Sequence, residues 1–394
     1  MNARAGIEGT LSFQILVIDS TVADVRLKSS RATGIDRMLA GRPVADALSL
    51  VPMLFSLCGT AQGVAAARAC EAAAGIVPAG AQQAARELLI LGEMVASHAW
   101  QLAIEWPRLL EEAPDPGTLL GIRRAVAALA GALYPARDWT RPGGGALKPD
   151  AVVLDDALEH IAGAVVTLVG AGFAEIRDSD DLARWSRRTG TTAARLIDRV
   201  MADDMAGFGR SGVAKLPGLP DRWFADRLSA DPDFATAPDL DGGPAETGAL
   251  GRVAGAPLMV ALTACFGNGL LPRFAARLVD LAGLPARMRD TAKLLEAARP
   301  APPDAAQGAS GSGAGSAETA RGRLAHWVAL NRGAVTAYRS VAPNEWNFHP
   351  RGAFVRGLVG LPADDGLRRR VDLLIAALDP CVPCSVMMEE RAGA

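Results

Sequence analysis

Two cysteines near the C-terminal end, Cys381 and Cys384, lie three positions apart in the segment DPCVPC at 379–384. Thiols at this spacing can face one metal ion together, and the proline between them stiffens the turn. Such a pair is a partial site for a soft metal, which additional sulfur ligands would complete. The remaining cysteines of the chain are Cys58, Cys70 and Cys265.

The composition excludes several classes of function. Half of the 394 residues are hydrophobic, 21% are charged and the formal net charge is −2, so nothing favours a nucleic acid or an anionic membrane surface as partner. Five cysteines, an odd number in a long chain, argue against a disulfide framework and for a reducing compartment. No signal peptide is recognised, and the longest uncharged apolar run, 161–173, is too short to span a bilayer. We therefore expect a cytoplasmic protein.

The hydrophobic periodicity predicts an α+β fold that is mainly helical, with small peripheral β-hairpins. One hairpin is expected over residues 10–28, around an Asp19-Ser20 turn, and another over 324–339, around Asn331-Arg332-Gly333. The segment 206–255, rich in Gly, Pro and Asp, is expected to be mostly loop. Helices are predicted at 63–74, 82–106 (stopped by Pro107), 117–134, 149–170, 180–205, 270–298 and 364–378.

Residues 299–317 consist mostly of Ala, Gly, Ser and Pro, which bury little surface. We predict a disordered insertion there. Because the elements on its two sides belong together, the chain is expected to form a single domain over 1–394.

The order of several motifs resembles the large subunit of nickel–iron hydrogenases. Near the start, GIEGTL is similar to that family's Arg-Ile-Glu-Gly-His, and the final DPCVPC is similar to its Asp-Pro-Cys-x-x-Cys. The similar segments are 6–11, 41–43, 244–252, 273–277, 318–322, 343–347 and 379–384. The resemblance extends over nearly the whole chain and implies a large-subunit-like helical body.

The main departure concerns the thiolates. The family holds nickel and iron with two Cys-x-x-Cys pairs, in which the second cysteine of each pair bridges both metals. An ungapped alignment from 68–71 places Cys58 on the second cysteine of the first pair, Phe55 on the first, and Gln62 on a nearby histidine. The alternative places Cys58 on the first cysteine, needs a three-residue deletion and leaves Ala61 as its partner.

On the ungapped alignment, Cys58 and Cys384 correspond to the bridging thiolates, which are the protein ligands of iron, whereas one nickel-only thiolate is missing. The pattern resembles the HupK/HoxV group of hydrogenase assembly proteins. This resemblance implies a non-catalytic scaffold that holds an Fe(CN)2CO unit on Cys58, Cys384 and, as a further candidate, Cys381, without nickel. Its implied partners are HypC-type maturation chaperones and the hydrogenase large-subunit precursor. A metal-free adaptor and a divergent catalytic hydrogenase remain as alternatives.

Other positions follow from the same resemblance. Arg321 and Asp379 correspond to residues near the diatomic ligands, although Arg321 could instead be a surface arginine at the start of a hairpin. Glu8 corresponds to a proton-transfer glutamate, and a buried contact with backbone amides is the alternative. Asp36 stands where a magnesium-binding glutamate is expected, which puts that metal in doubt.

The remaining chemically active side chains have simpler interpretations. His98 lies on an apolar helix face and is expected to be a core histidine, and neither His326 nor His349 has a partner at metal-ligand spacing. Cys70 and Cys265 are expected to be buried and to act as small hydrophobic residues. The arginines at 368–370 are expected on a solvated helix face, or alternatively at a dock for an acidic partner.

Overall fold

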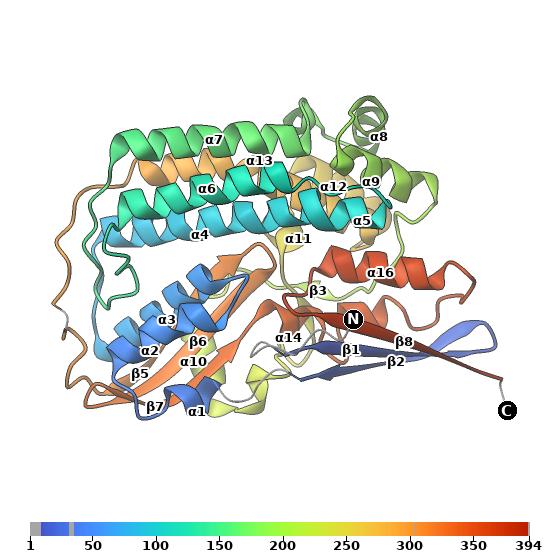
Figure 1. The fold of residues 1–394 in the computed structure, drawn as a ribbon. Coiled ribbons are helices and arrows are strands. Elements are labelled where there is room, and N and C mark those ends of the chain that lie inside the picture. Colours follow the sequence, from blue (N-terminus) through green and yellow to red (C-terminus); the bar gives the residue numbers. More distant parts are fainter. Residues whose placement is uncertain (1–8, 31–34, 303, 393–394) are drawn as a thin grey trace.

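The structure, a computed structural model, describes residues 9–30, 35–302 and 304–392. A layer of long helices lies over two three-stranded sheets, with the shorter helices around them (Figure 1). The layer contains α4 (Gly80–Trp100), α6 (Pro116–Leu133), α7 (Ala151–Val169) and α13 (Leu270–Ala292). The predicted fold class, a mainly helical α+β fold with small sheets, is confirmed.

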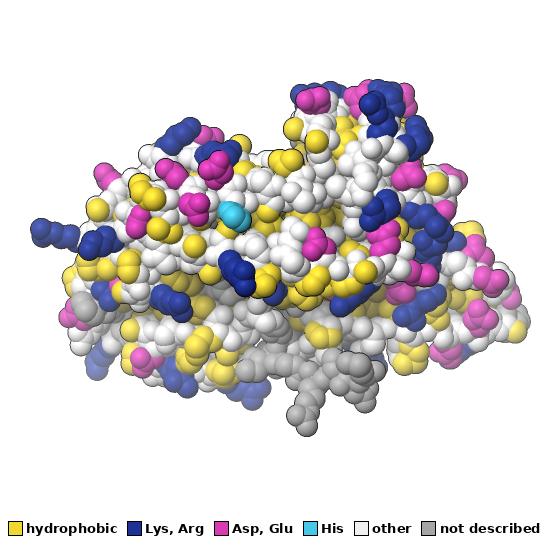
Figure 2. All heavy atoms as spheres, turned by 45° about the horizontal axis from the view of Figure 1, so that its top comes forward, with side chains coloured by type: hydrophobic (Ala, Val, Ile, Leu, Met, Phe, Trp, Pro, Cys, Tyr) yellow, Lys and Arg dark blue, Asp and Glu magenta, His cyan; other side chains and the backbone are white. Residues whose placement is uncertain are grey.

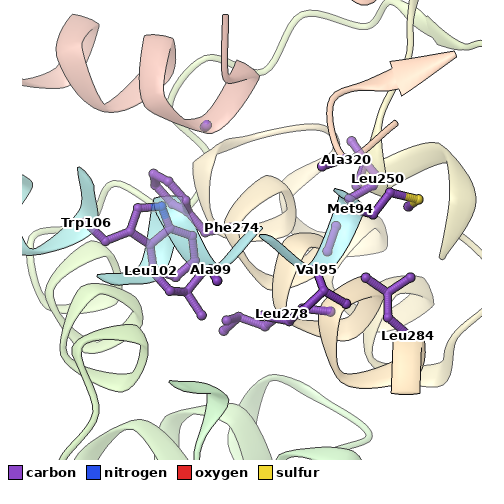
Figure 3. Close-up of a cluster of buried hydrophobic side chains, with 14 of the residues drawn as sticks. Met94, Val95, Ala99, Leu102, Trp106, Leu250, Phe274, Leu278, Leu284 and Ala320 are labelled. Carbon is purple, nitrogen blue, oxygen red and sulfur yellow. The ribbon is translucent and has the colours of Figure 1, made fainter. Parts of the chain in front are cut away.

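Helices α4 and α13 form the centre of the core. Val95 and Ala99 on α4 face Phe274 and Leu278 on α13, and all four side chains are buried (Figure 3). Trp106 packs edge-on against Phe274, with ring centroids 5.3 Å apart. Each large apolar side chain buried in this way contributes roughly 1.5–3 kcal/mol. This packing fixes the orientation of two helices that also carry polar side chains.

The helix predicted over 82–106 continues past Pro107. A π-helical turn, η2 (Gln101–Glu105), follows α4 directly and leads into α5 (Trp106–Leu109). The π-helical turn lies just before Pro107, and the Ala103 carbonyl, to which proline has no N–H to donate, accepts from the Asp115 N–H at 2.8 Å. The prediction that Pro107 stops the helix was therefore wrong.

The first sheet has the strand order β2-β1-β8. Strands β1 (Leu11–Ile18) and β2 (Thr21–Ser29) form the predicted hairpin, and Asp19 and Ser20 take the positive φ angles that a tight two-residue turn requires. Strand β8 (Cys384–Arg391) runs parallel to β1, with Cys384 opposite Leu11. The residue pattern of 384–391 was not predicted to form a strand. Strand β8 ties the second cysteine of the closing motif to the first strand of the chain.

The second sheet has the order β5-β6-β7. Strands β6 (Gly322–Asn331) and β7 (Ala334–Val341) form the second predicted hairpin. Strand β5 (Gly311–Thr319) pairs antiparallel with β6. The prediction of a disordered insertion over 299–317 was therefore wrong for its second half.

The small residues of β5 allow it to lie directly on helix α3 (Gly59–Ala74). A Cβ atom on Gly313 would lie 2.5 Å from the Ala73 backbone nitrogen, and one on Gly315 would lie 2.5 Å from the Ala65 carbonyl oxygen. Side chains cannot be accommodated at such distances, so the strand needs glycine there. The composition that suggested disorder reflects a close helix–strand contact.

One further helix prediction required correction. The helix predicted over 180–205 is two helices, α8 (Ser179–Arg188) and α9 (Thr192–Ala202), and the side chain of Thr191 caps the second by accepting from the Ala194 N–H. The segment 206–255 is mostly loop as predicted, but it also contains α10 (Asp221–Ala230). The other elements are α1 (Ile35–Leu39), α2 (Val44–Leu50), η1 (Val51–Leu54), η3 (Phe173–Glu175), β3 (Ala214–Lys215), η4 (Asp233–Ala235), β4 (Ala245–Glu246), α11 (Ala249–Arg252), α12 (Pro257–Phe266), α14 (Pro343–Asn347), α15 (Ala353–Arg356) and α16 (Leu367–Leu378).

The surface of the helical layer carries both signs of charge. Figure 2 shows Lys and Arg side chains interspersed with Asp and Glu over this face, in keeping with the formal net charge of −2. Within the described residues, no helix combines the length and the apolar character needed to cross a membrane.

Candidate metal centre

Cys58 occupies the N-cap position of α3 and is buried. Gly59 begins the helix, and a Cβ there would lie 2.5 Å from the Pro52 carbonyl oxygen, so the chain approaches η1 closely at this point. Gln62 Nε2 donates a hydrogen bond to Cys58 Sγ at 3.4 Å. Burial raises the pKa of the Cys58 thiol well above its usual range, while the Gln62 hydrogen bond and the charge of Arg321 oppose that rise. The N-terminal end of a helix also favours negative charge on the sulfur.

Glu93 from α4 provides the cap that Cys58 does not. The Cys58 side chain makes no capping hydrogen bond, and the backbone N–H groups of Thr60 and Ala61 donate instead to the two Glu93 carboxylate oxygens, at 2.6 and 3.1 Å. Burial raises the pKa of Glu93 to about 7, against these two hydrogen bonds. A carboxyl group with this pKa therefore lies next to the most deeply buried candidate ligand.

Asp379 is the centre of a buried network of charges. It ends α16 in the left-handed conformation, with φ 53°, and its side chain is buried. Its carboxylate accepts from Gln101 Nε2 at 2.6 Å and from Arg277 Nη1 at 2.8 Å, and lies 3.3 Å from Arg321 Nη2. Burial alone would raise the pKa of Asp379, but Arg321 and Arg277 outweigh it and hold the pKa below its usual range.

Arg321 connects this network to the cysteines. Its Nη1 donates to Ser97 Oγ at 2.8 Å, and its buried Nε has no hydrogen-bond partner among the described residues. Burial favours the neutral form, but Asp379 and the sulfurs of Cys381 and Cys58 outweigh it, so the pKa of Arg321 is raised. The alternative of a surface arginine is therefore wrong.

One group of site residues was missed in the sequence although a signal was present. Glu93, Ser97 and Gln101 are spaced four residues apart, so they form a polar stripe on a helix whose neighbouring positions are apolar. Each contacts the site, and the last begins the π-helical turn η2. Such turns are frequent at functional sites. The break in the apolar pattern was the available signal.

Cys381 and Cys384 lie in different environments. Cys381 is half-buried, its backbone N–H donates to Asn344 Oδ1 at 3.2 Å, and it lines a cavity of about 20 Å³ together with Phe55 and Gln62. Cys384 is exposed at the start of β8. Across residues 9–30, 35–302 and 304–392, no three His, Cys, Asp or Glu side chains form a group that could hold a metal ion. The proposed three-thiolate ligand set stays a prediction.

Three of the four histidines are buried, His98 as predicted, whereas His160 is exposed on α7. His98 Nε2 lies 2.9 Å from Asp280 Oδ2, and burial lowers the pKa of the imidazole. His326 Nε2 lies 2.5 Å from Gln62 Oε1, so this buried histidine belongs to the surroundings of Cys58. His349 Nδ1 accepts from the backbone N–H of Arg351 at 3.0 Å.

The structure places the remaining candidate residues, where it describes them, outside the charge network. Glu8 lies outside the described residues, and Asp36 is exposed on α1. Cys70 is buried as predicted, and burial raises its pKa to about 12. Cys265 is exposed, because it lies on the outer face of α12, so the prediction of burial was wrong there.

Two of the motifs that carried the resemblance meet in the structure. Arg273 on α13 donates from Nε and Nη2 to the two carboxylate oxygens of Glu246, both at 2.8 Å, and from Nη1 to the Gly209 carbonyl at 3.0 Å. All of these side-chain groups are buried. The pair links 244–252 to 273–277 and fixes the part of α13 that presents Arg277 to Asp379.

Comparison with known proteins agrees with this arrangement. A family model described as nickel-dependent hydrogenase matches residues 266–387. The [NiFeSe] hydrogenases of Desulfovibrio vulgaris Hildenborough and Desulfomicrobium baculatum superpose with TM-scores of 0.64 and 0.67 at 18% and 15% identity, in each case over 93% of this chain and 94% of the other. At these identities the likeness shows the fold of the hydrogenase large subunit.

Sequence relatives define the family more narrowly. The hydrogenase expression/formation protein HupK of Rhizobium leguminosarum bv. viciae is 33% identical and matches over 98% of each chain. HoxV of Cupriavidus necator, described in the same way, is 31% identical over 91% of each chain. Hydrogenase-2 large chain of Escherichia coli is 35% identical over only 21% of this chain. The chain therefore belongs to the HupK/HoxV family of hydrogenase expression/formation proteins, which are homologous to the nickel–iron hydrogenase large subunit.

Proposed function

We propose that this maturation protein is a non-catalytic scaffold that transiently holds an Fe(CN)2CO unit and passes it to a hydrogenase large-subunit precursor. The proposed ligands are Cys58 and Cys384, with Cys381 as a further candidate. HypC-type chaperones are the proposed donors of the unit. The observation that carries the proposal is the buried positive charge beside the cysteines.

That charge follows from a simple count. The guanidinium groups of Arg277 and Arg321 share one carboxylate, Asp379, and all three are buried. His98 adds no charge near neutral pH, because burial lowers its pKa. The excess positive charge lies beside the thiols of Cys58 and Cys381 and beside Glu93, which is only partly ionised near neutral pH because its pKa is raised to about 7. A site with this potential favours thiolates over thiols and an anionic cargo over a neutral one.

The free donor of Arg321 suits a cyanide ligand. Its Nε is buried and has no partner among the described residues. A cyanide nitrogen bound to iron is a hydrogen-bond acceptor, and a guanidinium N–H in a dry site is a strong donor to it. Asp379 and Ser97 hold the other end of the guanidinium, so the orientation of Arg321 is set before cargo arrives.

The proposal includes no nickel because Phe55 provides no ligand. In the ungapped alignment Phe55 stands in place of a nickel-binding cysteine, and it lines the cavity that Cys381 also lines. A phenyl ring provides no ligand to a metal, and Gln62 in the same wall provides only an amide. A site for nickel and iron together, as a catalytic hydrogenase needs, has no fourth thiolate here.

Loading requires movement of the outer cysteines. The cavity beside Cys381 has a volume of about 20 Å³, enough for about one water molecule but not for iron with three diatomic ligands. The proposal therefore requires the turn 381–384 to move outward when cargo binds, while Asp379 keeps its buried contacts. Transfer then exchanges Fe–S bonds to this chain for Fe–S bonds to the recipient. Iron keeps its oxidation state, and each released sulfur keeps its electron pair and takes up a proton.

A metal-free adaptor for the large-subunit precursor is the second candidate. It is favoured by the lack of a preformed three-ligand group within the described part of the chain. In that case the cysteines would have no ligand role, and the large-subunit fold would serve to bind the maturation partners.

Infrared spectroscopy separates these functions. The protein is purified anaerobically from cells that also make the cyanide-synthesising machinery. Cyanide and carbonyl stretches without nickel would support the scaffold, protein without diatomic bands would favour the adaptor, and nickel with H2 uptake would overturn both. Cys58→Ala or Cys384→Ala should abolish the bands. The matched controls, Cys70→Ala for a buried thiol and Cys265→Ala for an exposed one, should leave them.

If Cys58→Ala keeps the full band intensity, the ungapped alignment of the N-terminal motif is wrong. If only Cys384→Ala keeps it, the cargo is held by Cys58 and Cys381, the two cysteines that the structure brings closer to Arg321.

A further inference from the structure

Three buried polar side chains form a row that ends at the sulfur of Cys58. Gln62, His326 and Tyr338 are 1%, 0% and 3% exposed. Gln62 Nε2 lies 3.4 Å from Cys58 Sγ, Gln62 Oε1 lies 2.5 Å from His326 Nε2, and His326 Nδ1 is hydrogen-bonded to the Tyr338 hydroxyl. The residues come from α3, β6 and β7, so two strands and a helix are needed to assemble the row.

The hydrogen bonds of this row can all run toward the sulfur. When Gln62 donates its amide N–H to Cys58, its carbonyl oxygen must accept from His326 Nε2–H. The neutral imidazole then has an acceptor at Nδ1, which takes the Tyr338 O–H. A sulfur that releases its proton when it binds a metal can only accept hydrogen bonds. This direction of the hydrogen bonds is therefore the one that suits a metal-bound sulfur.

The row is expensive to bury. Buried polar groups stabilise a fold only when every partner is satisfied, and apolar side chains of similar size would fill the same space without that condition. The ring of His326 also packs edge-on against Tyr338, with centroids 5.5 Å apart. Packing therefore explains the rings, but the hydrogen bonds that continue to Cys58 need a different explanation.

We propose that Gln62, His326 and Tyr338 are positioning residues that withdraw electron density from the Cys58 sulfur and so set how strongly it donates to bound iron. This inference rests on the proposed function, in which Cys58 is an iron ligand. Each hydrogen bond polarises the next, so the effect of the row on the sulfur exceeds that of Gln62 alone. Because an amide does not ionise, the donor nearest the sulfur is present at every pH.

The far end of the row lies at the wall of a groove. Tyr338 lines a groove of about 390 Å³, together with Ser29, Asn344 and Glu345, and the last three also line the small cavity beside Cys381. The side chains of His326 and Gln62 separate the Tyr338 hydroxyl from the Cys58 sulfur. A change at this hydroxyl can reach the sulfur only through hydrogen bonds, and this makes Tyr338 the decisive position for a test.

The first readout is the infrared spectrum of the loaded protein. Gln62→Met removes the donor, the sulfur donates more strongly, and the carbonyl and cyanide stretches should shift to lower wavenumber. Tyr338→Phe keeps the ring and should give a smaller shift in the same direction. Tyr134→Phe is the matched control, because the hydroxyl of this buried tyrosine donates to Gln82 Oε1 at 2.7 Å, away from the cysteines.

The second readout needs no iron. The rate at which iodoacetamide alkylates Cys58 in the metal-free protein is measured by peptide mass spectrometry relative to Cys265, an exposed thiol on α12. Loss of a hydrogen bond to a charged sulfur should slow the relative rate roughly tenfold in Gln62→Met. The relative rate should fall less in Tyr338→Phe and should not change in Tyr134→Phe.

The outcomes separate the two proposals. If the wild type shows no diatomic bands, the scaffold function fails, and the alkylation ratio alone decides whether the row acts on the sulfur. If bands are present and neither they nor the ratio respond to Tyr338→Phe beyond the response to Tyr134→Phe, the row does not act as a unit. The inference is then overturned while the scaffold function stands.

Discussion

The two sides of the candidate centre differ in how firmly they are held. On the inner side, Cys58, Arg321 and Asp379 are buried and are fixed by α3, α4, α13 and α16. On the outer side, Cys381 is half-buried in a turn, and Cys384 is exposed at the start of an edge strand. The inner side is buried and held by several helices, whereas the outer side is more exposed.

This difference has a physical origin. The inner groups exchange hydrogen bonds with long helices whose opposite faces lie in the main core, so they can move only if that core opens. In the turn 381–383, the backbone N–H of Cys381 donates to Asn344 Oδ1, and the Pro383 carbonyl accepts from the Leu11 N–H. A cargo site that must fill and empty needs one firm side and one yielding side.

The largest loss of stability is expected from a substitution of Asp379 on the inner side. Asp379→Ala should lower the free energy of unfolding by about 3–5 kcal/mol, because it leaves two buried guanidinium groups without their carboxylate. The measurement is urea denaturation. Asp372→Ala is the control, since Asp372 forms an exposed pair with Arg368 and its loss should change stability by about 0.5 kcal/mol or less. Equal losses in the two variants would show that the inner network is not preformed.

A pH titration of stability tests the cap on α3. Burial raises the pKa of Glu93 from its ordinary 4.5 to about 7, so the folded state holds a proton that the unfolded state has lost between these pH values. The contribution of Glu93 to the free energy of unfolding is full below pH 4.5 and is lost as the pH rises through 7. The loss of stability is at most about 3 kcal/mol. Glu93→Gln should remove this slope in denaturation experiments from pH 4.5 to 8. A variant with the slope of the wild type would assign the pH dependence to another group.

A pair of glycine substitutions tests the close approach of Gly59, next to Cys58, to the Pro52 carbonyl. Gly59→Ala should destabilise the fold by roughly 1–3 kcal/mol, because the new Cβ would meet the Pro52 carbonyl at 2.5 Å. Gly121→Ala on α6, where a Cβ meets nothing within 4 Å, should stabilise it by roughly 0.5–1 kcal/mol. The order of the two melting temperatures checks the prediction, and the reverse order would contradict it.

The smallest effect is expected on the outer side. Cys384→Ser should change the free energy of unfolding by no more than about 0.5 kcal/mol, because the thiol is exposed. Cys58→Ser should cost more, since it places a hydroxyl in a buried site. Chemical denaturation of both variants measures the difference. Equal costs would mean that the two cysteines are held alike.

Local patterns in the sequence predicted much of the fold. The hairpin of β1 and β2 was predicted because alternation on both sides of a two-residue turn specifies it without reference to the rest of the chain. Strand β5 could not be predicted in this way. Its Gly313 and Gly315 are required by the backbone of α3, which is more than 200 positions away in the sequence, and composition alone suggested flexibility.

In the candidate site, too, sequence motifs identified individual residues but could not predict how they meet in space. Cys58, Arg321 and Asp379 were named through motifs, and Arg277 was part of a motif without an assigned role. Their meeting depends on four elements whose packing no local pattern encodes. Glu93 was missed, although its place in a polar stripe on α4 could have drawn attention to it.

The parallel pairing of β1 with β8 has a consequence for the order of folding. Ser12 and Ser385 lie 3.1 Å apart in space but 373 positions apart in sequence, so this sheet closes one of the longest loops in the molecule. Cys58 and Gly59 lie close to Pro52 and Glu93, which are near in sequence, so these contacts form with little loop entropy. During refolding these local contacts should therefore form before the last cysteine reaches its position, which requires the first strand to capture β8. The centre is completed by the slowest class of contact in the chain.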